Sequence, residues 1–127
     1  MLSRKHLTLS CRQTLRFIES ADILYCKSQD YCTIIYINDG SSFVVSKTLF
    51  QLTKELNDPC FLRVSQSFLV NFSYIDHFDK LEKVVKLKNG EEIPFTLRIK
   101  DLIELVDAIV CKNAALGATS GNKRDKL

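Results

Sequence analysis

Two tight-turn signals divide the first hundred residues of this chain into short segments. They lie at residues 38–41 and 88–91, and each has a glycine in its third position. Glycine tolerates the positive φ that two-residue hairpin turns require. Residues 31–38 are rich in β-branched and aromatic side chains, and residues 42–45 supply the return strand across the first turn. The turns therefore predict antiparallel hairpins and a mainly β fold.

Other short apolar or alternating segments extend this pattern, and a polar loop interrupts it at residues 27–31. We expect these further extended segments at residues 6–10, 14–17, 21–26, 75–78, 83–87 and 92–96. Short strands joined by tight turns favour an open or sandwich-like β-sheet scaffold over a helical bundle.

The apolar period changes to that of a helix in two places. Leu49, Leu52 and Leu56 fall on one helical face, and Ser46 can cap the helix that carries them. Residues 98–111 carry a second apolar face at helical spacing. The scaffold is thus expected to hold one short central helix and one C-terminal helix.

Size and charge limit the class of protein. The chain has 127 residues, 46% hydrophobic and 26% charged, which suits one globular domain. No apolar run approaches the length of a membrane span, and the N-terminus lacks the apolar region of a secretory signal, so we expect a cytoplasmic protein with no membrane partner. Residues 1–111 carry equal numbers of acidic and basic side chains, and the net charge of +3 comes from residues 112–127. We expect a domain over residues 1–111 and a disordered basic tail over residues 112–127.

Five cysteines are present, and no two of them form a Cys-x-x-Cys pair. A zinc site therefore has little support. We interpret the cysteines as small hydrophobic residues that stay reduced. A more remote alternative is a redox sensor that uses Cys32.

Residues 61–75 contain the most unusual local pattern in the chain. Four polar residues stand together between apolar ones: Arg63, Ser65, Gln66 and Ser67. Such a cluster is expected to satisfy the backbone or to face a polar partner.

This segment and the order of the other elements resemble the LytTR family, bacterial transcription regulators that bind DNA with loops of a β-rich domain. The resemblance covers residues 6–108. It rests on residues 23–27, the turn at residues 38–40, the spaced leucines, residues 61–71, residues 87–90 and the pair formed by Thr96 and Arg98. It implies a LytTR-like elongated β-sheet or sandwich scaffold and a role as the output domain of a response regulator. The family usually has histidine where this chain has Ser65, and the loop before Tyr31 is one residue shorter here.

The resemblance also implies which residues contact DNA. Gln66 would read a base in the major groove, since a side-chain amide can pair with adenine N6 and N7. Arg98 would contact guanine or phosphate, unless it pairs with Asp101 instead. Ser65 and Ser67 would contact phosphate or cap the local backbone.

The remaining candidates have a supporting or less certain role. Arg63 would order the loop by bonding to backbone carbonyls. The loop at residues 27–31 is a third DNA-facing candidate, through Lys27, Gln29 and Tyr31. Lys100 is a general phosphate candidate.

Catalysis has weak support in the sequence. Neither histidine stands in a nucleophile motif, and no Gly-rich phosphate loop or metalloprotease motif is present. We therefore expect no enzyme, no cofactor and no metal. The expected partner is double-stranded DNA, with family members commonly on paired sites, which implies a homodimer on DNA. The alternative is a protein-interaction module on the same scaffold that has lost DNA binding.

Overall fold

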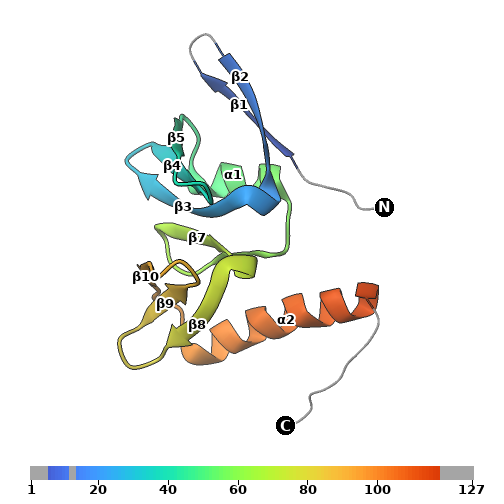
Figure 1. Ribbon diagram of the computed structural model, residues 1–127. Helices are drawn as coiled ribbons and strands as arrows, with labels where there is room; N and C mark the ends of the chain where they lie inside the picture. The colour runs from blue at the N-terminus through green and yellow to red at the C-terminus, as the bar shows by residue number, and fades with distance from the viewer. Residues whose placement is uncertain (1–5, 12–13, 118–127) are drawn as a thin grey trace. The chain divides into compact units, whose positions relative to one another are not determined.

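The chain forms two compact units, which divide between Thr96 and Leu97. The computed structural model describes residues 6–11 and 14–117. The described part of the first unit consists of antiparallel β-strands with one short α-helix, and that of the second is a single helix (Figure 1). The predicted mainly β class with two helices is therefore confirmed.

A five-stranded antiparallel sheet forms the centre of the first unit, with strand order β5-β4-β3-β7-β6. Its strands are β3 (Ile23–Gln29), β4 (Cys32–Ile37), β5 (Ser42–Val45), β6 (Phe61–Arg63) and β7 (Phe68–Asn71). The predicted turn at residues 38–41 joins β4 to β5, and Gly40 adopts a φ of 95° there. This positive φ explains why glycine occupies the position.

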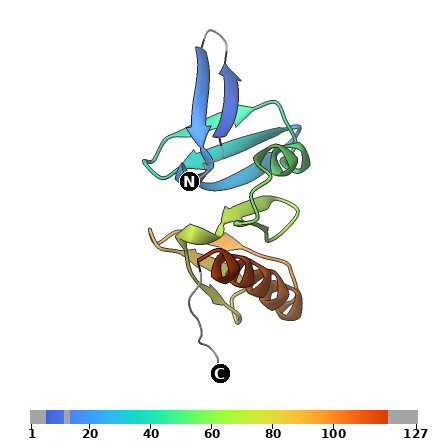
Figure 2. The ribbon, with the colours of Figure 1, turned by 90° about the vertical axis from the view of Figure 1, so that its right-hand side faces the viewer.

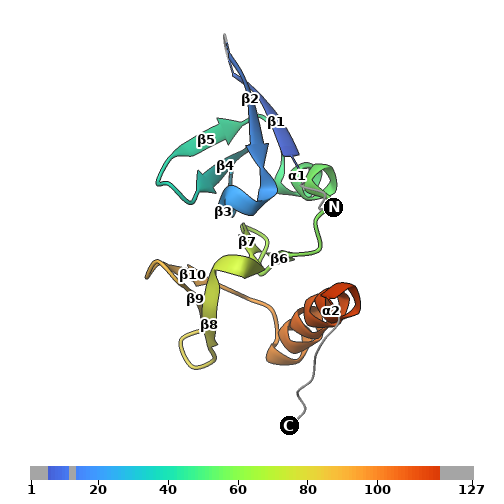
Figure 3. The ribbon, with the colours of Figure 1, turned by 45° about the vertical axis from the view of Figure 1, so that its right-hand side comes forward.

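Two smaller sheets complete the first unit. The hairpin of β1 (His6–Cys11) and β2 (Thr14–Glu19) projects from the rest of this unit (Figure 3). Strands β8 (Ile75–Asp79), β9 (Val84–Leu87) and β10 (Glu92–Pro94) form a three-stranded sheet. Short 3-10 turns, η1 (Ser20–Asp22) and η2 (Phe72–Tyr74), precede β3 and β8.

Helix α1 (Leu49–Leu56) packs on the five-stranded sheet through the predicted leucine face (Figure 2). Leu49, Leu52 and Leu56 are all buried in one core cluster. The sheet contributes Ile23, Cys26, Ile35, Ile37, Val45, Phe61 and Leu69 to that cluster, and the β1–β2 hairpin contributes Leu7 and Ile18.

The start of α1 differs from the prediction. The N-cap is Thr48 and not Ser46, because Thr48 and Gln51 form a reciprocal capping box. The Thr48 Oγ1 accepts from the Gln51 N–H at 3.1 Å, and the Gln51 side chain accepts from the Thr48 N–H at 2.9 Å. Two N–H groups at the helix start are thereby satisfied at once, which a serine two residues earlier cannot do.

The opposite face of β3 is also covered, which explains the apolar run at its start. Tyr25 stacks on Tyr36 with ring centroids 4.5 Å apart, and its hydroxyl donates to Glu91 at 3.3 Å. Burial, and then the nearby Glu91 carboxylate, raise the pKa of Tyr25 well above its usual range. This tyrosine therefore stays neutral and links the central sheet to the turn between β9 and β10.

The second unit contains α2 (Ile99–Gly117). This helix continues six residues beyond the predicted end at Cys111, into the segment expected to be a disordered tail. Alanine and leucine at residues 114–116 are strong helix formers, which explains the extension. Residues 118–127 of the predicted tail lie outside the described part of the chain. Within the described part, none of the helices has the length and apolarity to cross a bilayer.

Candidate nucleic-acid interface

The polar cluster of residues 63–67 forms the tip of the β6–β7 hairpin. Arg63 pairs with Leu69 in the strand register, and the Val64 N–H donates to the Phe68 carbonyl at 3.1 Å. Val64 is fully buried, and its carbonyl accepts from the Thr96 N–H at 3.0 Å. The three residues beyond it, 65–67, make the connecting loop on a base that is anchored on both sides.

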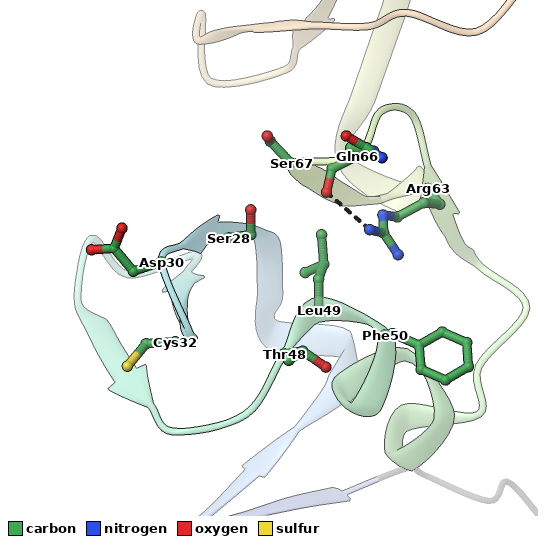
Figure 4. A pocket seen from close by; sticks show the side chains of 9 residues that line it. All are labelled: Ser28, Asp30, Cys32, Thr48, Leu49, Phe50, Arg63, Gln66 and Ser67. Carbon is green, nitrogen blue, oxygen red and sulfur yellow. Dashed lines mark hydrogen bonds between the residues drawn. The ribbon is translucent and has the colours of Figure 1, made fainter.

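Arg63 holds this loop from inside. Its Nε donates to the Ser65 carbonyl at 2.9 Å. Its Nη2 donates to the Gln66 carbonyl at 2.9 Å, the bond marked in Figure 4. A planar guanidinium can reach two successive carbonyls in this way, which a lysine ammonium cannot do with the same fixed geometry. These are the bonds to backbone carbonyls expected for Arg63, and its supporting role in DNA binding stays a prediction.

Ser65 is also used within the loop. Its Oγ accepts from the Ser67 N–H at 3.1 Å and from the Phe68 N–H at 3.2 Å. Of the two roles that the sequence left open for Ser65, the structure contains the backbone cap. A side chain that caps two N–H groups needs only a short hydroxyl, so serine suits this position.

Gln66 and Ser67 are the loop residues whose side chains remain exposed. Neither side chain makes a hydrogen bond with another residue that the structure describes. The Ser67 carbonyl, in contrast, accepts from the Ser28 N–H at 2.9 Å and so joins the loop to β3. The backbone of the loop is thus bound to the protein while two polar side chains stay available to a ligand.

The third predicted DNA-facing segment is not a loop of five residues. Lys27 and Gln29 belong to β3, where they pair with Ile34 and Cys32 of β4. Alternate residues at this end of the strand face solvent, so polar side chains are compatible with the strand. The turn itself is short and is formed by Asp30, with a φ of 56°, and by Tyr31.

Three side chains of this hairpin, those of Tyr31, Lys27 and Gln29, are exposed. Tyr31 is 88% exposed at the tip. Lys27 lies beside the β6–β7 hairpin, with its ammonium 6.0 Å from the centroid of the Phe68 ring. Gln29 is exposed as well. Each can therefore reach a partner without a change in the backbone.

The two hairpin tips and the start of α1 enclose a groove of about 330 Å³. We call it the tip groove. It is open to solvent, and its walls carry one cation, Arg63, and one carboxylate, Asp30 (Figure 4). Its lining residues are Ser28, Asp30, Cys32, Thr48, Leu49, Phe50, Arg63, Gln66 and Ser67.

Phe50 and Thr48 line the groove and were not among the site residues predicted from the sequence. Phe50 is 61% exposed beside the groove. Its position one residue after Leu49 places it about 100° away from the leucine stripe, which is the signal that could have identified it as exposed. Thr48 could have been found from the Thr-x-x-Gln pattern of a capping box.

Arg98 and Lys100 lie in the second unit. Arg98 directly precedes α2, and Lys100 is the second residue of that helix. The Arg98 side chain is 81% exposed, and its Nε lies 3.1 Å from Asp101 Oδ2. The ion pair that the sequence allowed as an alternative is therefore present. It occupies one of the five guanidinium N–H groups, and the others remain donors. Lys100 is exposed.

The cysteines and histidines give no evidence of a reactive centre in the described residues. Cys26 is buried, which raises the pKa of its thiol to about 12 and keeps it protonated. Cys32 is half-buried beside the tip groove. His77 Nδ1 lies 2.7 Å from Asp76 Oδ2 on the exposed β8 strand. Among the described side chains, no three His, Cys, Asp or Glu residues are arranged to hold a metal.

Comparisons with known proteins agree with the geometry. The family model for the LytTr DNA-binding domain matches residues 13–106. The sensory transduction protein LytT of Bacillus subtilis (strain 168) is 33% identical over 92 residues, which cover 69% of this chain and 37% of that protein. The present chain thus spans well under half the length of this relative. A solved LytTr DNA-binding domain from Bacillus cereus superposes with a TM-score of 0.67 at 18% identity, covering 82% of this chain and 98% of that one.

Proposed function

The chain belongs to the LytTR family of DNA-binding domains, and we propose that it regulates transcription by reading a specific sequence in the major groove of DNA. The observation that carries this proposal is the state of the β6–β7 loop. Its carbonyls are bound by Arg63 and by the Ser28 N–H, whereas the Gln66 amide is exposed and has no partner among the described residues. A fixed backbone with one available amide is suited to base recognition, because little conformational entropy is lost on binding.

Gln66 is the proposed base reader. Its amide offers a donor and an acceptor on one plane, which matches adenine N6 and N7 in the major groove. Ser67, next to it, would donate its hydroxyl to a phosphate oxygen. Arg63 and Ser65 would act on DNA indirectly, by holding the loop that presents these two side chains.

The β3–β4 hairpin supplies the next set of proposed contacts. Lys27 would meet a phosphate, and Gln29 and Tyr31 would reach the sugar-phosphate backbone or a base edge. The carboxylate of Asp30 stands between them and repels phosphate, since it forms no ion pair with another described residue. This hairpin is therefore proposed to approach DNA through its exposed strand end and Tyr31, with Asp30 turned to the tip groove that it lines.

Arg98 is the second proposed reader, for guanine or for phosphate. The ion pair with Asp101 is exposed and therefore weak, so exchanging it for a DNA contact costs little. Lys100 would add a phosphate contact nearby in the sequence. We further propose that the protein acts in the cytoplasm and that two copies occupy paired sites.

Selection of bound duplexes from a random pool tests this function. A sequence-specific regulator enriches one motif over successive rounds, and the motif should contain an adenine whose replacement lowers affinity. If no motif is enriched while the folded chain still binds random duplex, specific reading is refuted although DNA binding stands. If no duplex binds, the alternative of an interaction module is favoured.

A further inference from the structure

Helix α2 carries more apolar residues than one buried face requires. Leu102 and Ile109 are 3% and 4% exposed. Ile103 and Val110, each one position further along the chain, are 55% and 47% exposed. They are therefore large apolar side chains that water contacts.

The exposed residues belong to a regular stripe. Ile99, Ile103, Val106 and Val110 follow one another at intervals of four, three and four residues. Alternation of four and three is the spacing of the apolar seam of a coiled coil, in which each residue packs between residues of a second helix. Ile99 and Val106 are half-buried, so the stripe keeps exposed surface along its length. It ends at Val110, because the next two seam positions hold asparagine and glycine.

The charges beside this stripe match a second copy of the same helix in antiparallel orientation. Ile103 then faces Val106 of the other copy, and Ile99 faces Val110. In this register Lys100 of one helix lies opposite Asp107 of the other, beside the seam. The two-fold symmetry of the pair gives this contact twice. Both side chains are exposed, and neither forms an ion pair with another described residue. A parallel pair would instead place Lys100 and Asp107 opposite Leu102 and Ile109, which are uncharged.

We propose that α2 is a homodimer surface, on which the Ile99–Ile103–Val106–Val110 seam pairs with the same seam of a second copy, antiparallel and flanked by two Lys100–Asp107 ion pairs. The occupant is a second copy because, within the described part of the chain, α2 supplies both the spacing and the complementary charge. Use of this contact on paired DNA sites rests on the proposed function, whereas the association itself requires no DNA.

The seam is small, and its size determines where it acts. Four residues per copy are far fewer than the roughly 20 to 30 per partner of a stable interface, so the dimer is weak in free solution. Two copies on neighbouring sites experience an effective concentration of about millimolar, at which a weak contact becomes occupied. The contact therefore supplies cooperativity on paired sites.

Sedimentation of the full chain without DNA tests the proposal. The wild-type chain should self-associate as its concentration approaches about millimolar, and Ile103→Glu with Val110→Glu should be monomeric throughout. Leu81→Glu is the matched control, because Leu81 is 91% exposed on the turn between β8 and β9 and lies outside the seam. Thermal melting of each variant shows whether the fold is retained. A wild-type chain that stays monomeric, or a folded double variant that still dimerises, overturns the proposal.

Charge exchange tests the register and does not depend on the apolar variants. Lys100→Asp and Asp107→Lys should each weaken dimerisation by roughly five- to tenfold, because two exposed pairs become repulsive in every dimer. The combined variant should regain dimerisation, and a combined variant as weak as either single one overturns the antiparallel register. Only sedimentation is measured for these charge variants, because Lys100 is also a proposed phosphate contact.

Cooperative binding to two adjacent sites should be lost in the Ile103→Glu, Val110→Glu variant, while affinity for one site is unchanged. Since dimerisation is measured without DNA, its failure and a failure to enrich a motif are separate results.

Discussion

Individual residues of the β6–β7 loop divide into those that build it and those that it presents. The side chains of Arg63 and Ser65 form hydrogen bonds with the backbone of residues 65–68, at distances between 2.9 and 3.2 Å. Gln66 and Ser67 keep their side chains exposed. In sequence these four residues are one polar cluster, yet in space they have opposite roles. Substitutions should therefore separate base selection from loop order.

Gln66→Ala should weaken binding to the selected motif by about 1 to 3 kcal/mol and relax the preference at one base pair. The amide is exposed and makes no bond within the described chain, so its loss should leave the melting temperature unchanged. Titration of the selected duplex and of its single-base variants measures both effects. Affinity for random duplex serves as the control, and it should not change. An unaltered preference at every base pair would remove Gln66 from the reading role.

Arg63→Ala should lower the stability of the fold by about 1 to 3 kcal/mol, because two carbonyls lose a charged donor. Arg63→Lys should restore only part of this, since an ammonium lacks the planar fork. The informative measurement is the slope of log affinity against log salt for the selected duplex. A residue that only orders the loop leaves the slope unchanged, whereas a phosphate contact reduces it by about 0.9.

Arg16→Ala is the matched control for this experiment. Arg16 is another arginine of the first unit, and its guanidinium lies 5.1 Å from the centroid of the Phe43 ring, away from the tip groove. The Arg16→Ala substitution removes the same charge from the protein and leaves the loop unchanged. If both variants changed the salt slope equally, the effect would reflect net charge and not loop order.

The secondary-structure elements were predictable to different degrees. The β4–β5 hairpin and the leucine face of α1 follow from the turn glycine and from the period of the apolar residues, and both are present. The end of β3 was not predictable from local composition. Lys27 and Gln29 are polar, and only their pairing with β4, and that of Lys27 with Phe68 of β7, shows that they extend the strand. The pairing of Lys27 with Phe68 joins segments that are distant in the sequence, so it leaves no local signal.

The capping box of α1 leads to a prediction at this scale. Thr48→Ala should reduce the free energy of unfolding by about 0.5 to 2 kcal/mol, because the Gln51 N–H loses its acceptor. Ser46→Ala is the matched control, since Ser46 is exposed and lies two residues before the cap. Denaturant unfolding measures both. Equal losses for the two variants would show that Ser46 contributes as much as Thr48 to the start of α1.

The β4–β5 turn should make stability depend on pH in the acid range. Hydrogen bonds from the Ser41 hydroxyl and then from the Ser41 N–H hold the pKa of Asp39 below its usual value. A carboxyl whose pKa is lower in the folded state contributes stability above its unfolded pKa, and this contribution is lost as the pH falls through the folded value. Asp39→Asn should therefore flatten the acid side of the stability curve. Unfolding midpoints measured from neutral to acid pH test this, and an unchanged acid slope contradicts it.

At the scale of the whole molecule, the family could be predicted from sequence, and the arrangement of the site could not. The order of the turns, the leucines and the polar cluster was sufficient to indicate a LytTR domain. This order can be read directly from the amino-acid sequence and requires no knowledge of side-chain geometry. Whether a side-chain donor already bonds to another group of the protein depends on distances of a few ångströms. The Arg98–Asp101 pair and the two bonds of Arg63 are examples, because sequence allowed each of them but could not choose between them and a contact with DNA.

The balanced charge of residues 1–111 gives the last prediction, which concerns the whole molecule in contact with DNA. The proposed phosphate or base contacts include three cations, Lys27, Arg98 and Lys100, since Arg63 is engaged within its loop. Neutralising three phosphates gives a slope of log affinity against log salt of about −3. A chain truncated after Gly117 should keep most of this slope, because only the cations of residues 118–127 are removed. Fluorescence anisotropy over a series of salt concentrations measures both slopes. A slope that disappears on truncation would mean that the tail, and not the hairpins and the start of α2, supplies the contact with phosphate.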